Sequence, residues 1–146
     1  MREKTINKMK VRFSSISSNE ALSRIIITGF IMPCNPTVEE IADIKTIVSE
    51  AVTNCIVHGY KNSEDGIIEI SATYTESFKL TVMIKDKGCG IENIEQARQP
   101  LFTTDKENER SGMGFSIMES FSDKLSVVSD VGKGTKITFV KQLSRK

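Results

Sequence analysis

The chain has 146 residues, of which 38% are hydrophobic and 27% charged, a mixture typical of a single globular domain. Lysine and arginine together number 20 against 19 acidic residues, and the net charge of +1 predicts no direct nucleic-acid or membrane partner. The longest apolar stretch, residues 25–32, is much shorter than the ~20 residues that span a bilayer. Because the N-terminus has no apolar signal core, the expected compartment is the cytoplasm.

Three cysteines, Cys34, Cys55 and Cys89, lie far apart in the sequence. They form neither the close pair that is typical of a zinc site nor the framework of a small secreted scaffold. We therefore expect them to be reduced thiols, with no function that the sequence assigns.

The first part of the chain predicts a strand and two helices. Apolar and basic residues alternate over residues 9–13, the period of a half-buried strand. Ser17 and Glu20 have the spacing of a capping box and predict a helix over about residues 18–31. After two prolines, Thr37 and Glu40 repeat that spacing and predict a second helix that ends at Gly59.

The second part predicts two antiparallel strand pairs with a helix between them. Residues 68–74 and 78–84 alternate like a hairpin, and residues 125–128 and 137–139 form the second pair. The polar segment over residues 91–110 predicts a mobile lid, and a further helix begins near residue 112. The expected fold is an α/β sandwich with a mixed, mainly antiparallel sheet, helices on one face and a polar opposite face.

Three polar side chains share one stripe of the second predicted helix. Glu50, Asn54 and His58 stand four residues apart, so a carboxylate, an amide and an imidazole face the same space. A solvated helix edge explains this spacing equally well, and a structural role suits the chain's one histidine. The stripe is therefore a candidate site only in combination with other segments.

Two glycine-rich segments could contact a ligand. In residues 86–90, Asp86 ends a predicted strand, and Gly88 and Gly90 would let backbone approach a flat ligand, although a plain turn also needs glycines. In residues 110–114 a glycine pair begins a helix, whose free N–H groups attract phosphate. Thr135, after Gly134, fits either a hairpin turn or a pocket.

These segments resemble the conserved boxes of a known superfamily. Residues 50–59 resemble the N box of the GHKL superfamily, which includes gyrase-type ATPases and histidine kinases, and residues 86–90 and 112–114 resemble its two glycine boxes. Residues 98–104 and 109–115 are similar to the anti-sigma F factors of spore-forming bacteria, and the resemblance covers nearly the whole chain. It implies one domain over residues 1–146, with an ATP lid at about residues 98–113.

The resemblance implies a Bergerat pocket for ATP or ADP with Mg²⁺. Asp86 would accept the adenine amino group, Asn54 would ligate Mg²⁺, and Glu50 would act as general base. Arg110 would face the terminal phosphate as a second catalytic residue. The other implied nucleotide contacts are Gly88, Gly90, Thr103, Thr104, Ser111, Gly112, Met113, Gly114 and Thr135.

The resemblance also implies two activities. As a homodimer, the protein would bind and inhibit the sporulation sigma factor sigma F, and as a serine kinase it would phosphorylate an anti-anti-sigma protein. Arg24 matches a partner contact of the family, although a solvated helix arginine is the simpler interpretation. The alternatives are a regulator of a general stress sigma factor, an ATPase without kinase activity, and a module that binds nucleotide only structurally.

Overall fold

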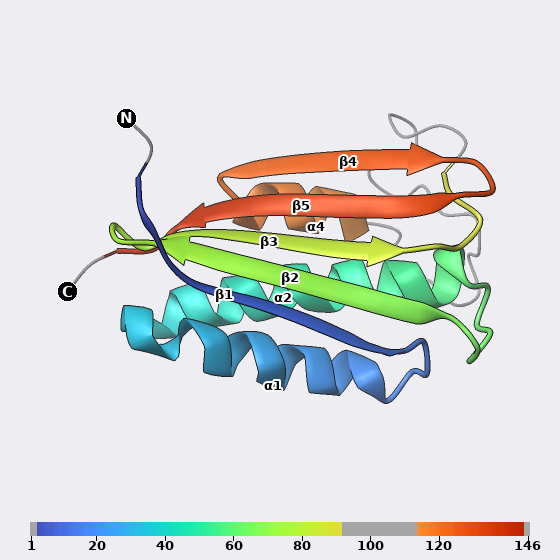
Figure 1. Ribbon diagram of the computed structural model, residues 1–146, viewed down its shortest axis with the longest axis horizontal. Coiled ribbons are helices and arrows are strands. Elements are labelled where there is room, and N and C mark those ends of the chain that lie inside the picture. Colours follow the sequence, from blue (N-terminus) through green and yellow to red (C-terminus); the bar gives the residue numbers. More distant parts are fainter. Residues whose placement is uncertain (1–2, 92–113, 145–146) are drawn as a thin grey trace.

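A β-sheet forms one layer of the molecule and helices form the other (Figure 1). The computed structural model describes residues 3–91 and 114–144, so the predicted lid at about residues 98–113 lies outside the described residues. The five strands are β1 (Thr5–Ser14), β2 (Ile67–Thr75), β3 (Lys79–Asp86), β4 (Lys124–Asp130) and β5 (Gly134–Gln142). The sandwich predicted from the sequence is confirmed.

The strand order is β1-β2-β3-β5-β4, and every pairing among the described strands is antiparallel. The expectation of a mixed sheet was wrong in this detail. The arrows in Figure 1 show that β3 and β4 run in the same direction, but β5 lies between them. Strands that run in the same direction are therefore never neighbours in the described sheet.

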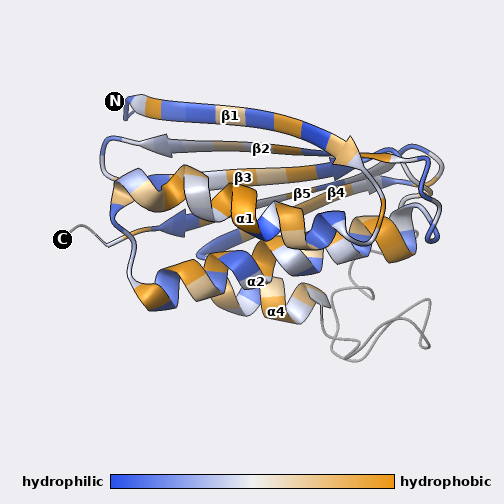
Figure 2. Cartoon of the chain, turned by 90° about the horizontal axis from the view of Figure 1, so that it is seen from below, coloured by the Kyte–Doolittle hydropathy of each residue, from blue (hydrophilic) through white to orange (hydrophobic). Residues whose placement is uncertain are grey.

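The helices α1 (Asn19–Ile31), α2 (Val38–Asn54) and α4 (Gly114–Phe121) cover one face of the sheet (Figure 2). A short 3₁₀ turn, η1 (Met32–Cys34), follows α1, and a π-helical turn, η2 (Cys55–Gly59), follows α2. Among the described residues, no helix is long and apolar enough to cross a membrane.

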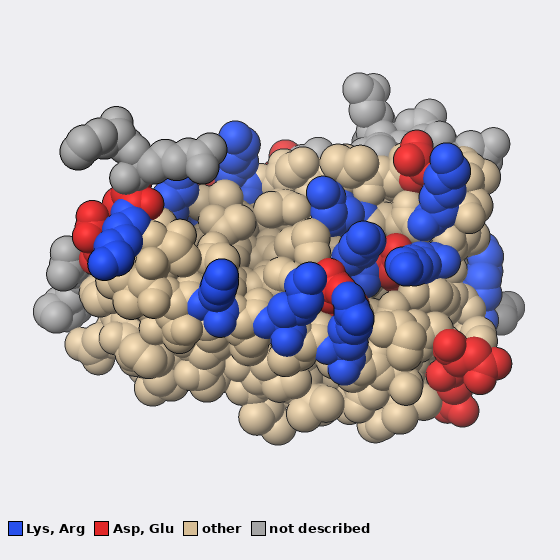
Figure 3. Space-filling model, in the orientation of Figure 1, with Lys and Arg blue, Asp and Glu red and all other residues tan. Residues whose placement is uncertain are grey.

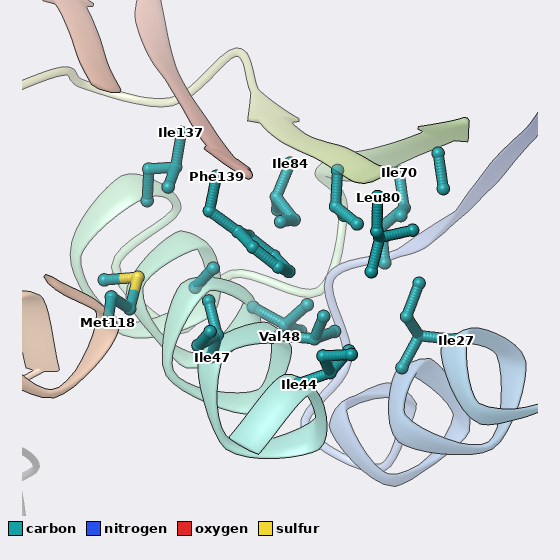
Figure 4. Close-up of a cluster of buried hydrophobic side chains, with 14 of the residues drawn as sticks. Ile27, Ile44, Ile47, Val48, Ile70, Leu80, Ile84, Met118, Ile137 and Phe139 are labelled. Atoms are coloured by element: carbon teal, nitrogen blue, oxygen red, sulfur yellow. The ribbon is translucent and has the colours of Figure 1, made fainter. Parts of the chain in front are cut away.

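The core fills the space between the two layers. Figure 4 shows apolar side chains of α1 and α2 pointing toward those of β2, β3 and β5, with Met118 of α4 at one side. The strands alternate buried and exposed residues, as their period predicts. Lys79 and Lys85 lie on the open face, where basic side chains are spread over the sheet (Figure 3), so the predicted polar face is confirmed.

The two predicted capping boxes had different outcomes. Thr37 caps α2 as predicted, because its hydroxyl accepts the Glu40 N–H at 3.0 Å and the Glu40 carboxylate accepts the Thr37 N–H at 2.9 Å. The box at Ser17 was wrong, since α1 has Ser18 as N-cap and no side-chain cap. Glu20 is therefore one residue too close to the N-cap to accept the N-cap N–H, as a capping box requires. Its carboxylate pairs with Arg24 at 2.7 Å instead.

Candidate functional site

A buried carboxylate at the end of β3 is the centre of the candidate site. Asp86 is 2% exposed, and its Oδ1 accepts the backbone N–H of Gly88 at 2.8 Å. No aligned hydrogen bond from a described residue reaches its Oδ2. Because a buried polar atom without a partner costs free energy, this oxygen is suited to receive an N–H group from a ligand.

The surroundings of Asp86 shift two pKa values. Burial raises the pKa of Asp86, although the Gly88 N–H, the Cys55 thiol and the Thr135 N–H oppose this effect. Burial, together with the adjacent carboxylate, raises the pKa of Cys55 well above its ordinary value. Cys55 therefore remains a neutral thiol against the carboxylate at physiological pH.

The backbone approaches itself closely around this carboxylate. A Cβ on Gly88 would lie 2.0 Å from the carbonyl oxygen of Gly59, so no side chain fits there. Gly90 has a φ of +78°, and a Cβ there would lie 2.2 Å from the carbonyl oxygen of Asp130. The sequence assigned Gly59 only as a helix stop, whereas a Cβ there would lie 2.9 Å from Asp86 Oδ2. Gly59 thus places backbone directly against the carboxylate, whereas Gly88 and Gly90 let the loop after β3 lie close to the π turn and to the end of β4.

Glu50 and Asn54 lie one turn apart on the last turns of α2, and both are half-buried. The helix is not α-helical as far as Gly59, because the Tyr60 N–H bonds to the carbonyl of Cys55, five residues back, at 2.8 Å. The wider π turn changes the helical period after Asn54. The regular spacing predicted for the stripe therefore holds for Glu50 and Asn54 but not for His58.

The loop after β3 is fastened on both sides. The N–H of Cys89 bonds to the carbonyl of Gly59 at 2.9 Å, and its thiol donates to the carbonyl of His58 at 3.1 Å. On the other side, the Cys89 carbonyl accepts the Gly132 N–H at 2.7 Å. The loop that carries Gly88 and Gly90 thus joins the π turn to the β4–β5 hairpin.

Ser129 is a residue that the sequence reasoning missed. Its hydroxyl accepts the Ile91 N–H at 2.7 Å and lies 2.8 Å from the hydroxyl of Thr135, which is 5% exposed. It thereby joins the start of the segment after β3 to the predicted pocket residue Thr135. Ser129 lies opposite Thr135 in the β4–β5 pairing, so a correct strand register would have indicated it.

Most of the described candidate residues lie at one end of the molecule. Figure 1 shows the end of β3, the end of α2 and the β4–β5 turn together there, and α4, which begins at Gly114, starts from the same end. The described candidates at this end are Glu50, Asn54, Asp86, Gly88, Gly90, Gly114 and Thr135. The predicted residues Thr103, Thr104, Arg110, Ser111, Gly112 and Met113 lie outside the described part of the chain.

Arg24 belongs to a different surface. Its half-exposed side chain borders a surface hollow of about 370 Å³, which is also lined by Ala21, Ile25, Thr28 and Lys45. Ile25 is 71% exposed beside it. The hollow therefore combines apolar and basic side chains from α1 and α2.

Comparison with known proteins agrees with this geometry. The histidine kinase-like ATPase domain family matches residues 32–141. An anti-sigma F factor from Clostridium beijerinckii is 51% identical over 94% of this chain and 96% of its own. Those from Bacillus cereus and Anoxybacillus flavithermus are 51% and 48% identical, and each is covered over 94% of its length.

Solved structures show the same fold. The crystal structure of the RsbU and RsbW domains of a Mycobacterium tuberculosis protein matches 97% of this chain and 34% of its own, with a TM-score of 0.71 and 17% identity. A blue-light activated histidine kinase domain from Erythrobacter litoralis matches 73% of this chain and 46% of its own, with a TM-score of 0.54 and 24% identity. With about half of the residues identical to curated relatives along nearly the whole of both chains, the chain belongs to the anti-sigma F factors, within the histidine kinase-like ATPase family.

Proposed function

We propose that the protein binds ATP with Mg²⁺, inhibits a sporulation sigma factor, sigma F, and phosphorylates a serine of an anti-anti-sigma protein. The observation that carries the nucleotide site is the buried carboxylate of Asp86, whose Oδ2 has no aligned donor among the described residues. The exocyclic amino group of adenine is a donor that a carboxylate accepts. The residues at the end of β3 therefore fit a purine that carries an amino group.

The end of α2 suits the phosphate side of the same pocket. Asn54 offers an amide oxygen, a hard ligand of the kind that Mg²⁺ prefers, and Mg²⁺ sites commonly use few protein ligands. Bound there, Mg²⁺ would neutralise charge on phosphate oxygens. Gly114 begins α4, and free N–H groups at a helix N-terminus favour phosphate. Arg110 and residues 111–113 would complete this side.

Glu50 is our proposed general base. It lies one helical turn before Asn54, so its carboxylate would be close to the phosphates that Asn54 helps to hold. In the kinase reaction it would take the proton of the incoming serine hydroxyl as the phosphoryl group is transferred. The same carboxylate would activate water in a simple ATPase, so the partner decides which reaction occurs.

The partner surface that we propose includes Arg24 and the neighbouring hollow. Exposed Ile25 supplies apolar area, and Lys45 together with Arg24, which is paired with Glu20, supplies charged groups at the same place. Aromatic or apolar anchors beside arginine are typical of binding hot spots. The names of the relatives, which are anti-sigma F factors, support a sigma factor as the partner. We further propose that the protein is a cytoplasmic homodimer, which would present two such surfaces to one sigma factor.

The test compares Glu50→Gln with the control Glu39→Gln, an exposed carboxylate in the first turn of the same helix. Phosphate transfer from labelled ATP to the anti-anti-sigma protein is measured beside sigma-factor binding. We expect Glu50→Gln to bind ATP and sigma factor normally and to transfer phosphate about 10²–10⁴-fold more slowly, the usual cost of removing a general base. Wild-type protein that hydrolyses ATP but never labels the partner would favour the ATPase alternative.

A further inference from the structure

Tyr60 connects three segments around the candidate pocket. Its backbone N–H closes the π turn at Cys55. Its hydroxyl accepts the backbone N–H of Lys87 at 2.7 Å and donates to the carbonyl of Ile67 at 2.5 Å. One residue therefore bonds to the end of the Asn54 helix, to the start of β2 and to the loop after Asp86.

The bond to Lys87 acts directly on the turn that presents the carboxylate. Lys87 stands between Asp86 and Gly88, and the Gly88 N–H donates to Asp86 Oδ1 within this turn. Fixing the Lys87 N–H fixes the peptide group that follows Asp86. Because Oδ1 is held by Gly88, the orientation of this turn decides where the other oxygen, Oδ2, points.

The aromatic ring that carries this hydroxyl is itself held in place. A Cβ on Gly66 would lie 2.6 Å from ring carbons of Tyr60, so the ring rests on the Gly66 backbone. Gly66 is held in turn by Ser15, whose Oγ accepts its N–H at 3.0 Å and whose N–H bonds to its carbonyl at 2.9 Å. Burial raises the pKa of the Tyr60 hydroxyl, so it stays protonated and can donate and accept at once.

We infer that Tyr60 is a positioning residue for purine recognition, whose hydroxyl holds the turn over residues 86–88 so that Asp86 Oδ2 meets the amino group of adenine. The inference rests on the proposed ATP binding and adds a residue that does not touch the nucleotide. It predicts an effect on base discrimination, because guanine carries a carbonyl where adenine carries its amino group. A loosened carboxylate would accept the amino group less well and reject the carbonyl less strongly.

The test compares Tyr60→Phe with Tyr74→Phe. Tyr74 is the chain's second tyrosine, and its hydroxyl accepts a hydrogen bond from Asn7 on the sheet. Both changes remove one hydroxyl and keep the ring. Calorimetry gives the Kd of each variant for MgATP and MgGTP. We expect Tyr60→Phe to weaken ATP binding roughly 3- to 10-fold, the effect of losing one ordinary hydrogen bond, and to narrow the preference for ATP over GTP. Tyr74→Phe should match wild type.

Each remaining outcome has a defined meaning. If wild-type protein does not bind ATP, the proposed function fails whatever the tyrosines do. If wild type binds ATP and Tyr60→Phe keeps both its affinity and its ATP preference within twofold, Tyr60 has no positioning role. If Tyr60→Phe does not fold, hydrogen exchange of the Lys87 amide in the wild-type protein tests the inference instead. The inference requires this amide to be protected from exchange, and rapid exchange would overturn it.

Discussion

Replacing Asp86 by Asn tests the centre of the site with the smallest possible change. The side chain is 2% exposed, so the isosteric amide keeps the packing and can still accept the Gly88 N–H through its oxygen. What changes is Oδ2, which becomes an NH₂ group. Two donors, this NH₂ and the amino group of adenine, would then face each other across the pocket.

The magnitude follows from the type of bond that is lost. A hydrogen bond to a charged group contributes roughly 1.5–3 kcal/mol, so the Kd for ATP should rise about 10- to 150-fold. The folded pKa of Asp86 lies above its ordinary value of 3.8 because the carboxylate is buried. Such a group stabilises the fold fully below its unfolded pKa, and this contribution is lost as pH rises through the folded pKa. As the pH falls toward 3.8, wild type should therefore gain stability from protonation of Asp86. Asp86→Asn has no carboxyl group at this position and should not show this gain.

Two assays check these expectations. Calorimetry measures the Kd for MgATP, and denaturant unfolding between pH 7 and pH 4 measures the ligand-free stability. Asp130→Asn, an exposed carboxylate in the neighbouring β4–β5 hairpin, is the control and should behave like wild type in both assays. If wild type binds ATP and the affinity of Asp86→Asn falls less than threefold, Oδ2 does not receive the amino group.

Three further changes address other parts of the structure. In thermal melts, saturating MgATP should raise the melting temperature of wild type, and Asn54→Ala should lose the magnesium-dependent part of that rise, whereas an equal rise would exclude Asn54 as the ligand. Gly88→Ala should lower the free energy of unfolding by more than about 1 kcal/mol and abolish ATP binding, because its Cβ would lie 2.0 Å from the Gly59 carbonyl oxygen. Gly29→Ala in α1 is the control: a Cβ there would meet nothing from other segments within 4 Å, so this change should be neutral or stabilising in denaturant unfolding. Burial alone would raise the pKa of Glu40, but the hydrogen bonds from the N–H groups of Thr37 and Ser144 outweigh burial and lower that pKa. The ionised Glu40 carboxylate therefore stabilises the fold above the ordinary pKa of 4.5, and this contribution is lost as pH falls through the folded pKa. The stability difference between wild type and Glu40→Gln should accordingly shrink on acidification below that value, and a constant difference would contradict the assignment.

Local patterns in the sequence predicted the elements of the fold well. Period-two alternation placed the strands and their buried faces, because side chains of a strand point alternately to opposite sides. The Thr37 cap was found because its partner, Glu40, lies within the same helical turn. Glu20 was misassigned because a second local partner, Arg24, is available one turn further along α1.

Long-range features could not be predicted in this way. The position of β5 between β3 and β4 depends on which strands find each other, and alternation within one strand carries no such information. The Tyr60 hydroxyl bonds to Lys87, which lies 27 residues later, and nothing near Tyr60 in the sequence indicates that partner. The π turn over Cys55–Gly59 was missed because its apolar residues also fit an ordinary helix.

The site itself was predicted mainly through resemblance. Spacing alone placed Glu50 and Asn54 on one side of α2, but it could not show that this helix ends beside the loop after Asp86. The structure adds the burial of Asp86, the lack of an aligned donor to its Oδ2 among the described residues, and the contributions of Gly59, Tyr60 and Ser129 to the site. These depend on packing between distant segments, which a single sequence does not reveal.

The position of β5 between β3 and β4 has a consequence for how the protein is made. β1 pairs with β2, and the paired residues lie between 53 (Ser14 with Ile67) and 70 (Thr5 with Thr75) positions apart in the sequence. β5 is the last described strand in sequence, although it lies between β3 and β4. During synthesis, β4 has no described strand to pair with until residues 134–142 have left the ribosome. The same residues carry Thr135 to its place opposite Asp86. A nascent chain should therefore gain nucleotide affinity late and abruptly, when its final strand is inserted into the sheet, and shorter chains should remain inactive.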